Sequence, residues 1–195
     1  MLELMCGLDE AGRGPLAGPV TAGAVILGPD FPVEILNDSK KLSEKKRDAA
    51  ELIIKEKALW GIGIVDHETI DKMNILQASM YAMKLAYDML LLKLDDWVKK
   101  NNISDYKIFC MTDGITVPPV NCADVRCQPK ADATFPSVMA ASIIAKVERD
   151  RIMYKMDELY PEYGYAKHKG YPTKAHKEIC RQIGPSPIQR HSFKY

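Results

Sequence analysis

The chain has 195 residues, of which 47% are hydrophobic and 27% charged, and its formal net charge is +1. This composition is typical of a soluble globular protein, and the length suffices for one domain with a sizeable core. The longest apolar stretch, residues 80–92, contains Lys84 and Asp88, which excludes a membrane-spanning helix there. The N-terminus has no basic segment followed by an apolar one, so we expect no signal peptide, no membrane partner and a cytoplasmic location.

The five cysteines are odd in number and form no Cys-x-x-Cys pair. Three of them lie in apolar, strand-like contexts. They therefore indicate small buried side chains in a reducing compartment rather than a disulfide framework. The cysteines are Cys6, Cys110, Cys122, Cys127 and Cys180.

Apolar patterning and capping residues predict an alternation of strands and helices. We expect strands at residues 4–8, 20–27, 59–65, 106–112 and 120–128, and helices at residues 44–57, 66–72, 74–100, 136–159 and 174–183. A loop over residues 162–173 and an irregular tail complete the chain. This order favours an α/β fold with a mixed sheet. Without a visible repeat or linker, residues 1–195 are expected to form a single domain, with a core to residue 160 and a basic loop and helix over residues 161–195.

Two of the predicted helices have the features of core elements. Apolar side chains recur at helical spacing along residues 74–100, which predicts a stripe buried in the core. In the helix over residues 136–159, Ala140, Ala141 and Ala145 would allow close packing on a sheet. The stripe consists of Leu76, Met80, Met83, Tyr87, Leu90 and Leu94.

The segment over residues 7–19 carries the first chemical signal. Asp9 and Glu10 follow a short apolar run and are followed at once by glycines, which let the backbone approach a ligand closely. Neighbouring strand residues point to opposite faces, so both acids face one metal only if the chain bends or two ions share the site. The alternative is a solvent-exposed strand end. The pattern indicates a cation held beside an anionic substrate.

A dinucleotide-binding loop is a second interpretation of the same glycines. Gly12, Gly14 and Gly18 loosely imitate the spacing of a phosphate loop. That motif needs a helix directly after the glycines. Here Pro15 and Pro19 lead into residues 20–27, which are predicted to form a strand, so the interpretation is disfavoured.

Two further acids stand at the ends of predicted sheet elements. Asp113 closes a strand and precedes a glycine, and Asp132 lies just ahead of the helix that begins at residue 136. With Asp9 and Glu10 they give four carboxylates, an oxygen-rich set that suits Mg²⁺ or Mn²⁺. Two such ions about 4 Å apart can activate water and stabilise the leaving oxygen of a phosphoryl displacement. No His/Cys cluster has the spacing of a zinc site.

The C-terminal region carries an excess of positive charge. Residues 163–195 contain seven Lys or Arg and one acid, Glu178, which gives +6. A basic end on a nearly neutral protein indicates a nucleic-acid contact. Lys167, His168, Lys169 and Tyr171 lie on one glycine-containing loop and suit a phosphate backbone with an aromatic ring against a sugar or base. An exposed basic turn is the alternative. Ser39 and Lys40 are a weaker candidate for phosphate contact.

Six ordered motifs and the last residues of the chain resemble ribonuclease HII over essentially the whole sequence. The motifs are Asp9–Gly14, Asp38–Leu42, Asp113-Gly114, Lys130–Asp132, Ala140–Asp150 and His168–Thr173, and the last segment is Gly184–Phe193. The resemblance implies the ribonuclease H-like fold, a mixed five-stranded sheet flanked by helices with a small helical C-terminal part. It implies a metal-dependent endonuclease that cuts 5′ of ribonucleotides in RNA–DNA hybrids and of single ribonucleotides embedded in duplex DNA, leaving 3′-hydroxyl ends.

The resemblance also assigns roles to individual positions. It implies a two-metal mechanism, with two divalent ions, Mn²⁺ or Mg²⁺, held in the substrate complex by the four catalytic carboxylates Asp9, Glu10, Asp113 and Asp132. It implies that Gly12, Arg13 and Gly14 read the ribose 2′-hydroxyl through backbone groups and that Tyr171 packs against the nucleotide at the RNA-to-DNA junction. It implies phosphate contacts for Ser39, Lys40, Lys169 and Thr173. We expect a monomer that acts on RNA–DNA hybrids and on duplex DNA containing ribonucleotides.

Two positions depart from the family pattern, and two other functions stay open. Ile115 stands where the family often has Asn, and Ala131 where it often has Gly; neither change removes a carboxylate. A junction resolvase of the same fold would share the acids but need no sensor of the 2′-hydroxyl. A nucleic-acid-binding module without catalysis would bind in a salt-sensitive way and cut nothing.

Overall fold

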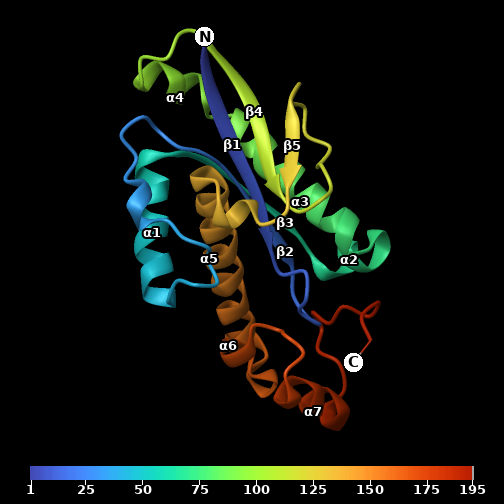
Figure 1. The fold of residues 1–195 in the computed structure, drawn as a ribbon. Coiled ribbons are helices and arrows are strands. Elements are labelled where there is room, and N and C mark those ends of the chain that lie inside the picture. The colour runs from blue at the N-terminus through green and yellow to red at the C-terminus, as the bar shows by residue number, and fades with distance from the viewer. Residues whose placement is uncertain (195) are drawn as a thin grey trace.

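The computed structural model describes residues 1–194 and contains one five-stranded sheet in the order β3-β2-β1-β4-β5 (Figure 1). The central strand β1 is antiparallel to β2 and parallel to β4, so the sheet is mixed, as predicted. β2 and β3 are antiparallel, and β4 and β5 are parallel. The strands are β1 Leu2–Ala11, β2 Val20–Ile26, β3 Leu59–Val65, β4 Tyr106–Asp113 and β5 Val125–Gln128.

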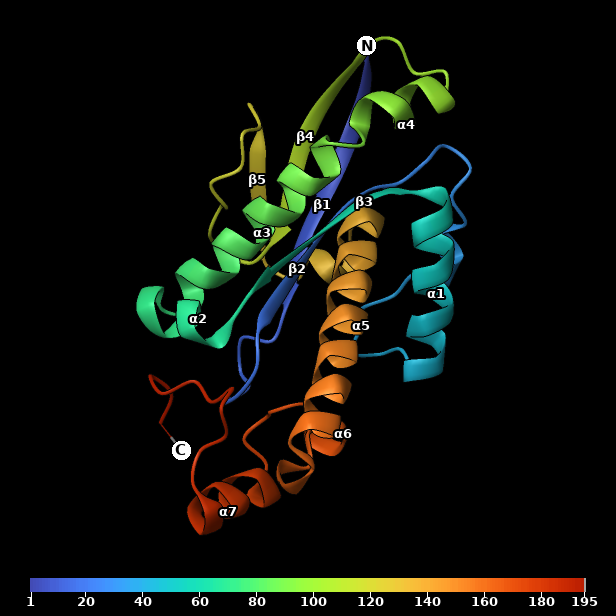
Figure 2. The ribbon, with the colours of Figure 1, turned by 180° about the vertical axis from the view of Figure 1, so that it is seen from behind.

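Helices cover both faces of this sheet. Ala24 and Ile26 of β2 pack in the cluster that includes α3 and α4, whereas Val25 packs with α1 and α5. Alternate residues of a strand face opposite sides, so these two groups of helices lie on opposite faces. In Figure 2, α1 and α5 run side by side. The helices are α1 Glu44–Lys57, α2 His67–Met73, α3 Ile75–Leu91, α4 Leu94–Lys100, α5 Pro136–Leu159, α6 Tyr165–His168 and α7 Lys174–Ile183.

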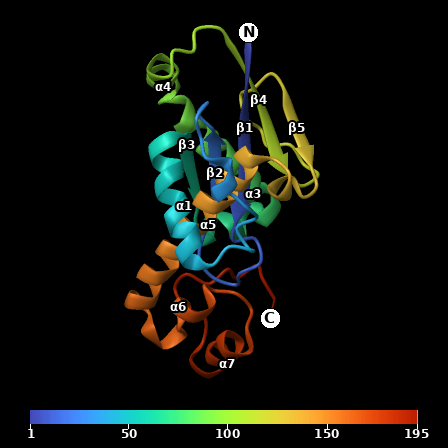
Figure 3. The same ribbon diagram turned by 60° about the vertical axis from the view of Figure 1, so that its left-hand side comes forward.

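Short 3-10 turns and the C-terminal helices complete the fold. The turns are η1 Val33–Ile35, η2 Ala131–Ala133 and η3 Pro161–Tyr163. Helices α6 and α7 lie beyond the end of the sheet, below α5 (Figure 3). They pack in a small cluster of their own with Ala17 and Met153. No helix within residues 1–194 is long and apolar enough to cross a membrane.

The single helix predicted over residues 74–100 is wrong, because the structure has two helices there. Helix α3 ends at Leu91 and α4 begins at Leu94. The N–H of Lys93 bonds the Leu90 carbonyl at 3.0 Å, a tighter turn than an α-helix makes. Both Leu94 and Val98 remain in the core after this break. The apolar spacing therefore predicted the burial of the rest of the stripe and missed the change of direction. It was wrong for Leu76, which lies in the first turn of α3 and is 37% exposed.

Larger differences from the predicted boundaries occur in three places. Strand β1 covers residues 2–11 instead of 4–8, so Asp9 and Glu10 lie inside the strand. The last strand covers only residues 125–128, because the N–H groups of Val120 and Cys122 bond carbonyls two residues earlier instead of a neighbouring strand. The region predicted as a loop over residues 162–173 contains part of η3 and the single turn α6. Gly164 separates these turns with a left-handed backbone, φ +71°.

Glycines in the strands let the helices approach the sheet closely. A Cβ placed on Gly23 would lie 2.4 Å from the Ala141 carbonyl oxygen of α5, and one on Gly63 would lie 2.0 Å from the Ala82 carbonyl oxygen of α3. Real Cβ atoms do not approach backbone oxygen so closely. The small residues predicted to pack α5 against the sheet are fully buried: Ala140, Ala141 and Ala145.

We predict that Gly63→Ala destabilises the protein by at least about 2 kcal/mol, because the added methyl group overlaps the backbone of α3. Thermal and urea unfolding would measure this loss. Gly14→Ala is the control, since its Cβ would lie 3.7 Å from the nearest atom, Cε1 of Tyr171. Equal stability of Gly63→Ala and the parent would contradict the close approach of α3 to β3.

Candidate active site

Two of the predicted catalytic acids lie side by side at one edge of the sheet. In the parallel pair of β1 and β4, Leu8 is opposite Thr112. Asp9 and Asp113 are the next residues of these strands, and neighbouring strands are about 4.8 Å apart. Asp113 in turn pairs with Gln128 of β5. The carboxyl ends of the parallel strands thus bring together acids that are 104 positions apart in the sequence.

The turn η2 brings the third strand-edge acid to the same place. It follows β5 closely, and its first residue, Ala131, donates its N–H to Oδ1 of Asp113 at 2.8 Å. Asp132 is the next residue and is buried. This hydrogen bond ties the position of Asp132 to that of Asp113. Glu10 follows Asp9 in β1 and is partly buried.

Burial and the negative charge of neighbouring carboxylates raise the pKa values of Asp9, Glu10 and Asp132. Burial raises the pKa of Asp9 well above its ordinary value, and the nearby charges of Glu10, Asp113 and Asp132 raise it further. Burial also raises the pKa of Glu10, against the opposing effect of Arg13. The pKa of Asp132 is raised by burial and by Asp113, with Lys40 opposing. The edge is therefore a set of like charges that a divalent cation would stabilise.

Asp9 accepts a hydrogen bond within the protein, and Glu10 and Asp132 each form an ion pair. Asp9 Oδ1 accepts the N–H of Glu10 at 2.8 Å, and Glu10 Oε1 lies 3.3 Å from NH1 of Arg13. Asp132 Oδ2 lies 3.8 Å from Nζ of Lys40. Among residues 1–194, no group of three His, Cys, Asp or Glu side chains is arranged to enclose a metal ion. The oxygen donors nevertheless fit Mg²⁺ or Mn²⁺, which bind through few carboxylates and complete their shells with water and substrate phosphate.

Most of the predicted substrate-binding residues line one cleft beside these acids. This cleft is lined by Asp9, Glu10, Ala11, Gly12, Arg13, Gly14, Ser39, Lys40, Ser142, Lys146 and Tyr171. A neighbouring cleft is also lined by Arg13 and reaches Asp113 and Ile115. The Tyr171 ring lies over Gly14 and brings the C-terminal region to the glycine loop.

Two predicted phosphate contacts do not line this cleft. The Nζ of Lys169 donates to the Ala166 carbonyl and lies 3.8 Å from the centre of the Tyr154 ring. Thr173 caps α7, where its Oγ1 accepts the N–H of His176 at 3.2 Å. Both side chains thus have structural partners in this conformation, and their contact with substrate stays a prediction.

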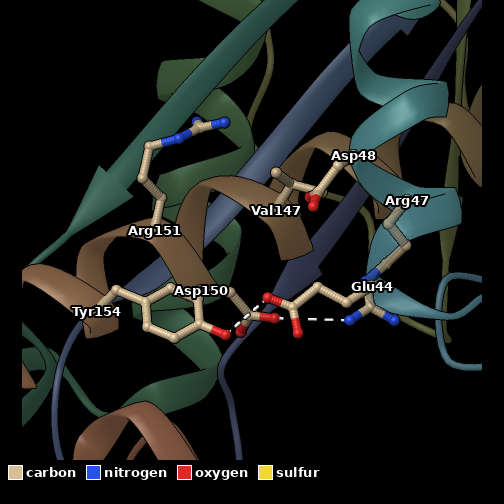
Figure 4. A pocket seen from close by; sticks show the side chains of 7 residues that line it. All are labelled: Glu44, Arg47, Asp48, Val147, Asp150, Arg151 and Tyr154. Carbon is tan, nitrogen blue, oxygen red and sulfur yellow. Dashed lines mark hydrogen bonds and ion pairs between the residues drawn. The ribbon is translucent and has the colours of Figure 1, made fainter.

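A third cleft lies between α1 and α5, and its residues support the loop that carries Ser39 and Lys40 (Figure 4). Arg47 donates from NH1 to the carbonyls of Ser39 and Leu42, at 3.1 and 2.6 Å. Its NH2 lies 3.8 Å from Oδ2 of Asp150, and Figure 4 draws this pair. Glu44, Asp150 and Arg151 also have partners here, and the two hydrogen bonds from Arg47 hold the loop in place.

Helix α5 contributes cleft residues to which the sequence had assigned no role. Ser142 bonds Ser39 Oγ to Oγ at 2.6 Å. Lys146 lines the cleft, donates to Asp150 at 2.7 Å and lies 5.9 Å from the centre of the Tyr171 ring. Ser142, Lys146 and Arg149 follow one another at intervals of four and three. Polar residues at this spacing share one helix face, and this signal could have revealed them.

Two fully buried arginines hold the glycine loop from behind. Arg149 donates to the carbonyls of Ala17, Pro19 and Lys169 at 2.9–3.2 Å. Burial lowers the pKa of Arg149 to about 10 and that of Arg190 to about 9, so both remain cationic at neutral pH. Arg190 donates to the carbonyls of Gly12, Arg13, Pro15, Gly18 and Pro19 at 2.7–3.2 Å.

The position of Arg190 corrects one expectation. The side chain was counted among the basic surface of residues 163–195, but it is fully buried against backbone carbonyls. It therefore cannot contact a phosphate. A guanidinium can donate to several carbonyls at once. The sequence pattern gave no sign that the carbonyls of the glycine loop need such a donor.

A stacked pair of histidines supports the loop that carries Tyr171. The rings of His168 and His176 are 4.4 Å apart. Nε2 of His168 bonds the Tyr163 carbonyl at 2.9 Å while Nδ1 accepts the N–H of Gly170, which assigns the proton to Nε2. Nδ1 of His176 bonds the Tyr171 carbonyl at 3.0 Å. Burial lowers the pKa of both rings and favours their neutral form.

The fold first defines the class of the protein, a ribonuclease H-like α/β protein. The ribonuclease HII in the PCNA:RNase HII complex from Archaeoglobus fulgidus superposes with a TM-score of 0.74 at 25% identity, covering 98% of this chain and 96% of that one. The ribonuclease H2 of Pyrococcus horikoshii gives 0.69 at 27% identity, over 98% and 94%. A ribonuclease HIII in complex with Mn²⁺ gives 0.69 at 18% identity, over 97% and 67%.

The sequence comparisons then identify the family. A family model described as Ribonuclease HII matches residues 6–195. A ribonuclease HII from Treponema denticola is 51% identical over 193 residues, covering 97% of this chain and 98% of that protein. One from Idiomarina loihiensis is 49% identical over 191 residues, covering 97% and 95%. The chain belongs to the ribonuclease HII family and is a ribonuclease H enzyme, as the sequence motifs had indicated.

We predict that Asp9→Asn lowers cleavage at least about a thousandfold and also raises the melting temperature of the metal-free protein by about 3 °C. The amide removes a buried charge and its repulsion, yet its oxygen can still accept the N–H of Glu10. Because the folded-state pKa of Asp9 is raised, its charge costs stability as pH rises above about 4. The gain is therefore present at neutral pH.

Cleavage assays and thermal unfolding with a chelator would measure both effects. Asp30→Asn is the control for stability, because Asp30 is an exposed loop aspartate. A fully active Asp9→Asn protein would remove Asp9 from the catalytic set. A lower melting temperature would show that the acids do not repel one another in the folded protein.

Proposed function

We propose that this enzyme is a metal-dependent endonuclease that cuts 5′ of ribonucleotides in RNA–DNA hybrids and of single ribonucleotides embedded in duplex DNA. One observation carries the proposal. The paired acids of β1 run directly into a glycine loop whose backbone lines the same cleft, with Tyr171 over it. A site that cuts only at ribonucleotides needs catalytic acids beside a group that senses the 2′-hydroxyl.

The proposed roles belong to residues that line this cleft or lie beside it. Asp9, Glu10, Asp113 and Asp132 hold two divalent ions when substrate is bound. The backbone of Gly12, Arg13 and Gly14 contacts the ribose, and Tyr171 packs against the nucleotide. Ser39 and Lys40 contact phosphate from their loop, and Lys169 and Thr173 contact it after the C-terminal loop has adjusted.

The chemistry is hydrolysis of a phosphodiester. Asp9, Glu10, Asp113 and Asp132 would hold Mg²⁺ or Mn²⁺, which would supply an activated water and stabilise the leaving oxygen. The water oxygen forms a bond to phosphorus, the bond from phosphorus to the 3′-oxygen breaks, and the products are a 3′-hydroxyl and a 5′-phosphate. Lys40 and Lys146 add positive charge near the reacting phosphate. The Mn²⁺ in the related ribonuclease HIII structure supports a divalent ion in this fold.

The proposed enzyme needs no second protein chain to complete its active site. We expect residues 1–195 to work as a single catalytic domain and as a monomer in the cytoplasm. Its partner is the nucleic-acid duplex itself. The cleft holds acids from β1, the loop of residues 38–42 and the C-terminal Tyr171, so one chain supplies all the proposed groups.

A cleavage assay tests the proposed function. The substrates are a DNA duplex with one ribonucleotide and the identical all-DNA duplex, each with Mg²⁺, Mn²⁺ or chelator. We expect one cut 5′ of the ribonucleotide that is absent from the all-DNA duplex and lost with chelator. Cutting of both duplexes would favour a general nuclease such as a junction resolvase. Binding without cutting in either metal would favour a non-catalytic module.

We predict that Tyr171→Ala lowers kcat/KM on the single-ribonucleotide duplex by about tenfold, because a ring stacked on the nucleotide contributes about 1–3 kcal/mol. Cleavage of a long RNA–DNA hybrid and binding of all-DNA duplex should change less. Tyr81→Ala is the matched control, since both tyrosines are 39% exposed and Tyr81 lies on α3, outside the cleft. Equal losses on both substrates would refute a sensing role for Tyr171.

A further inference from the structure

The buried guanidinium of Arg190 controls the orientation of the peptide groups in the glycine loop. Its NH2 donates to the Gly12 carbonyl at 2.7 Å and its NH1 to the Arg13 carbonyl at 3.2 Å. Three further carbonyls, of Pro15, Gly18 and Pro19, complete its set of acceptors. Within residues 1–194, no carboxylate forms an ion pair with Arg190. The cation is held by this loop.

Because a trans peptide is planar, these carbonyl contacts also determine where two N–H groups of the loop point. A carbonyl and the N–H of the next residue point in opposite directions across one planar peptide. Because the Gly12 and Arg13 carbonyls point to the buried guanidinium, the N–H groups of Arg13 and Gly14 point away from it. The same three residues line the cleft beside Asp9. The two N–H groups are therefore directed to the cleft side of the loop.

These two N–H groups have no acceptor within the part of the chain that the structure describes. Two other N–H groups of the loop do have acceptors. Leu16 donates to the Gly170 carbonyl and Gly18 to the Ile188 carbonyl, at 2.8 and 2.9 Å. A cation bound to a carbonyl polarises its peptide and strengthens the N–H as a donor, as in any chain of hydrogen bonds. Arg13 and Gly14 thus present two strengthened donors to an incoming oxygen.

We propose that Arg190 is a positioning residue for ribose recognition: it fixes the Gly12 and Arg13 peptides so that the N–H groups of Arg13 and Gly14 donate to the 2′-oxygen of the substrate. The inference rests on the proposed function of this cleft. Arg190 itself touches no substrate. A lysine at this position keeps the charge but replaces a planar fork of five donors with three donors at one point, so it cannot hold all five carbonyls.

The test compares the affinity for two duplexes that differ by one 2′-hydroxyl. Binding is measured in the Asp9→Asn protein, with and without Arg190→Lys, so that no cleavage occurs. The parent is expected to prefer the ribonucleotide duplex. Arg190→Lys should reduce this preference by about five- to tenfold, the worth of two hydrogen bonds, while affinity for the all-DNA duplex changes less than about twofold.

Arg151→Lys is the control for the exchange itself, because Arg151 pairs with Glu51 and Glu148 outside the cleft that holds Asp9. Gly63→Ala is the control for lost stability, because its Cβ would overlap the Ala82 carbonyl oxygen of α3 away from that cleft. Both variants should leave the preference for the ribonucleotide unchanged. A folded Arg190→Lys protein that keeps the parent's preference would overturn the positioning role. A parent without any preference would instead overturn the proposed function, and this inference with it.

A second measurement does not depend on the folding of the arginine variants. In the Asp9→Asn protein, the backbone amide resonances of Arg13 and Gly14 should shift when the ribonucleotide duplex is added and shift much less with the all-DNA duplex. The amide of Leu16, which already bonds the Gly170 carbonyl, is the internal control. Equal shifts with both duplexes would overturn the proposal.

Discussion

The arrangement of the cleft depends on the bonding of two buried guanidinium groups to the backbone of residues 12–19. This loop contains Pro15 and Pro19, which offer carbonyls but no N–H. Buried carbonyls need donors, and the loop cannot supply enough of its own. Arg149 and Arg190 make up this shortage, sharing the Pro19 carbonyl between them. The cost of burying each charge is offset by several charge-assisted hydrogen bonds.

The same bonds connect distant parts of the chain. Arg149 belongs to α5 and Arg190 to the segment after α7, so the loop after β1 is fixed to the helical C-terminal region. The N–H of Arg190 also bonds the Leu16 carbonyl at 2.8 Å, and Asp71 of α2 accepts the N–H groups of His191 and Ser192. These contacts place the Tyr171 loop over the strand edge that carries the acids.

What the sequence could predict follows from the range of each signal. Strand patterns are local, so the mixed sheet and the acids at the strand ends were accessible. The meeting of Asp9 and Asp113 was not accessible from the pattern, because it depends on the parallel pairing of β1 with β4. The resemblance to ribonuclease HII supplied the expected fold and the expected roles of the other site residues. The burial of Arg190 was not accessible, because charged residues are almost always exposed and its five acceptors lie more than 170 positions away. The break between α3 and α4 left the apolar spacing intact and was missed for that reason.

The electrostatics of the cleft joins these features. Negative charge gathers at the strand edge, where burial and mutual repulsion raise the pKa of Asp9, and positive charge lies behind the loop at Arg190. The peptides that follow Gly12 and Arg13 stand between the two, with carbonyls toward the cation and N–H groups toward the cleft. Both charges favour this orientation of the peptide dipoles. The acids attract a divalent cation, and the oriented N–H groups attract an oxygen lone pair. The electrostatic field of the buried acids therefore destabilises the metal-free protein and also favours binding of the cation and the ribonucleotide.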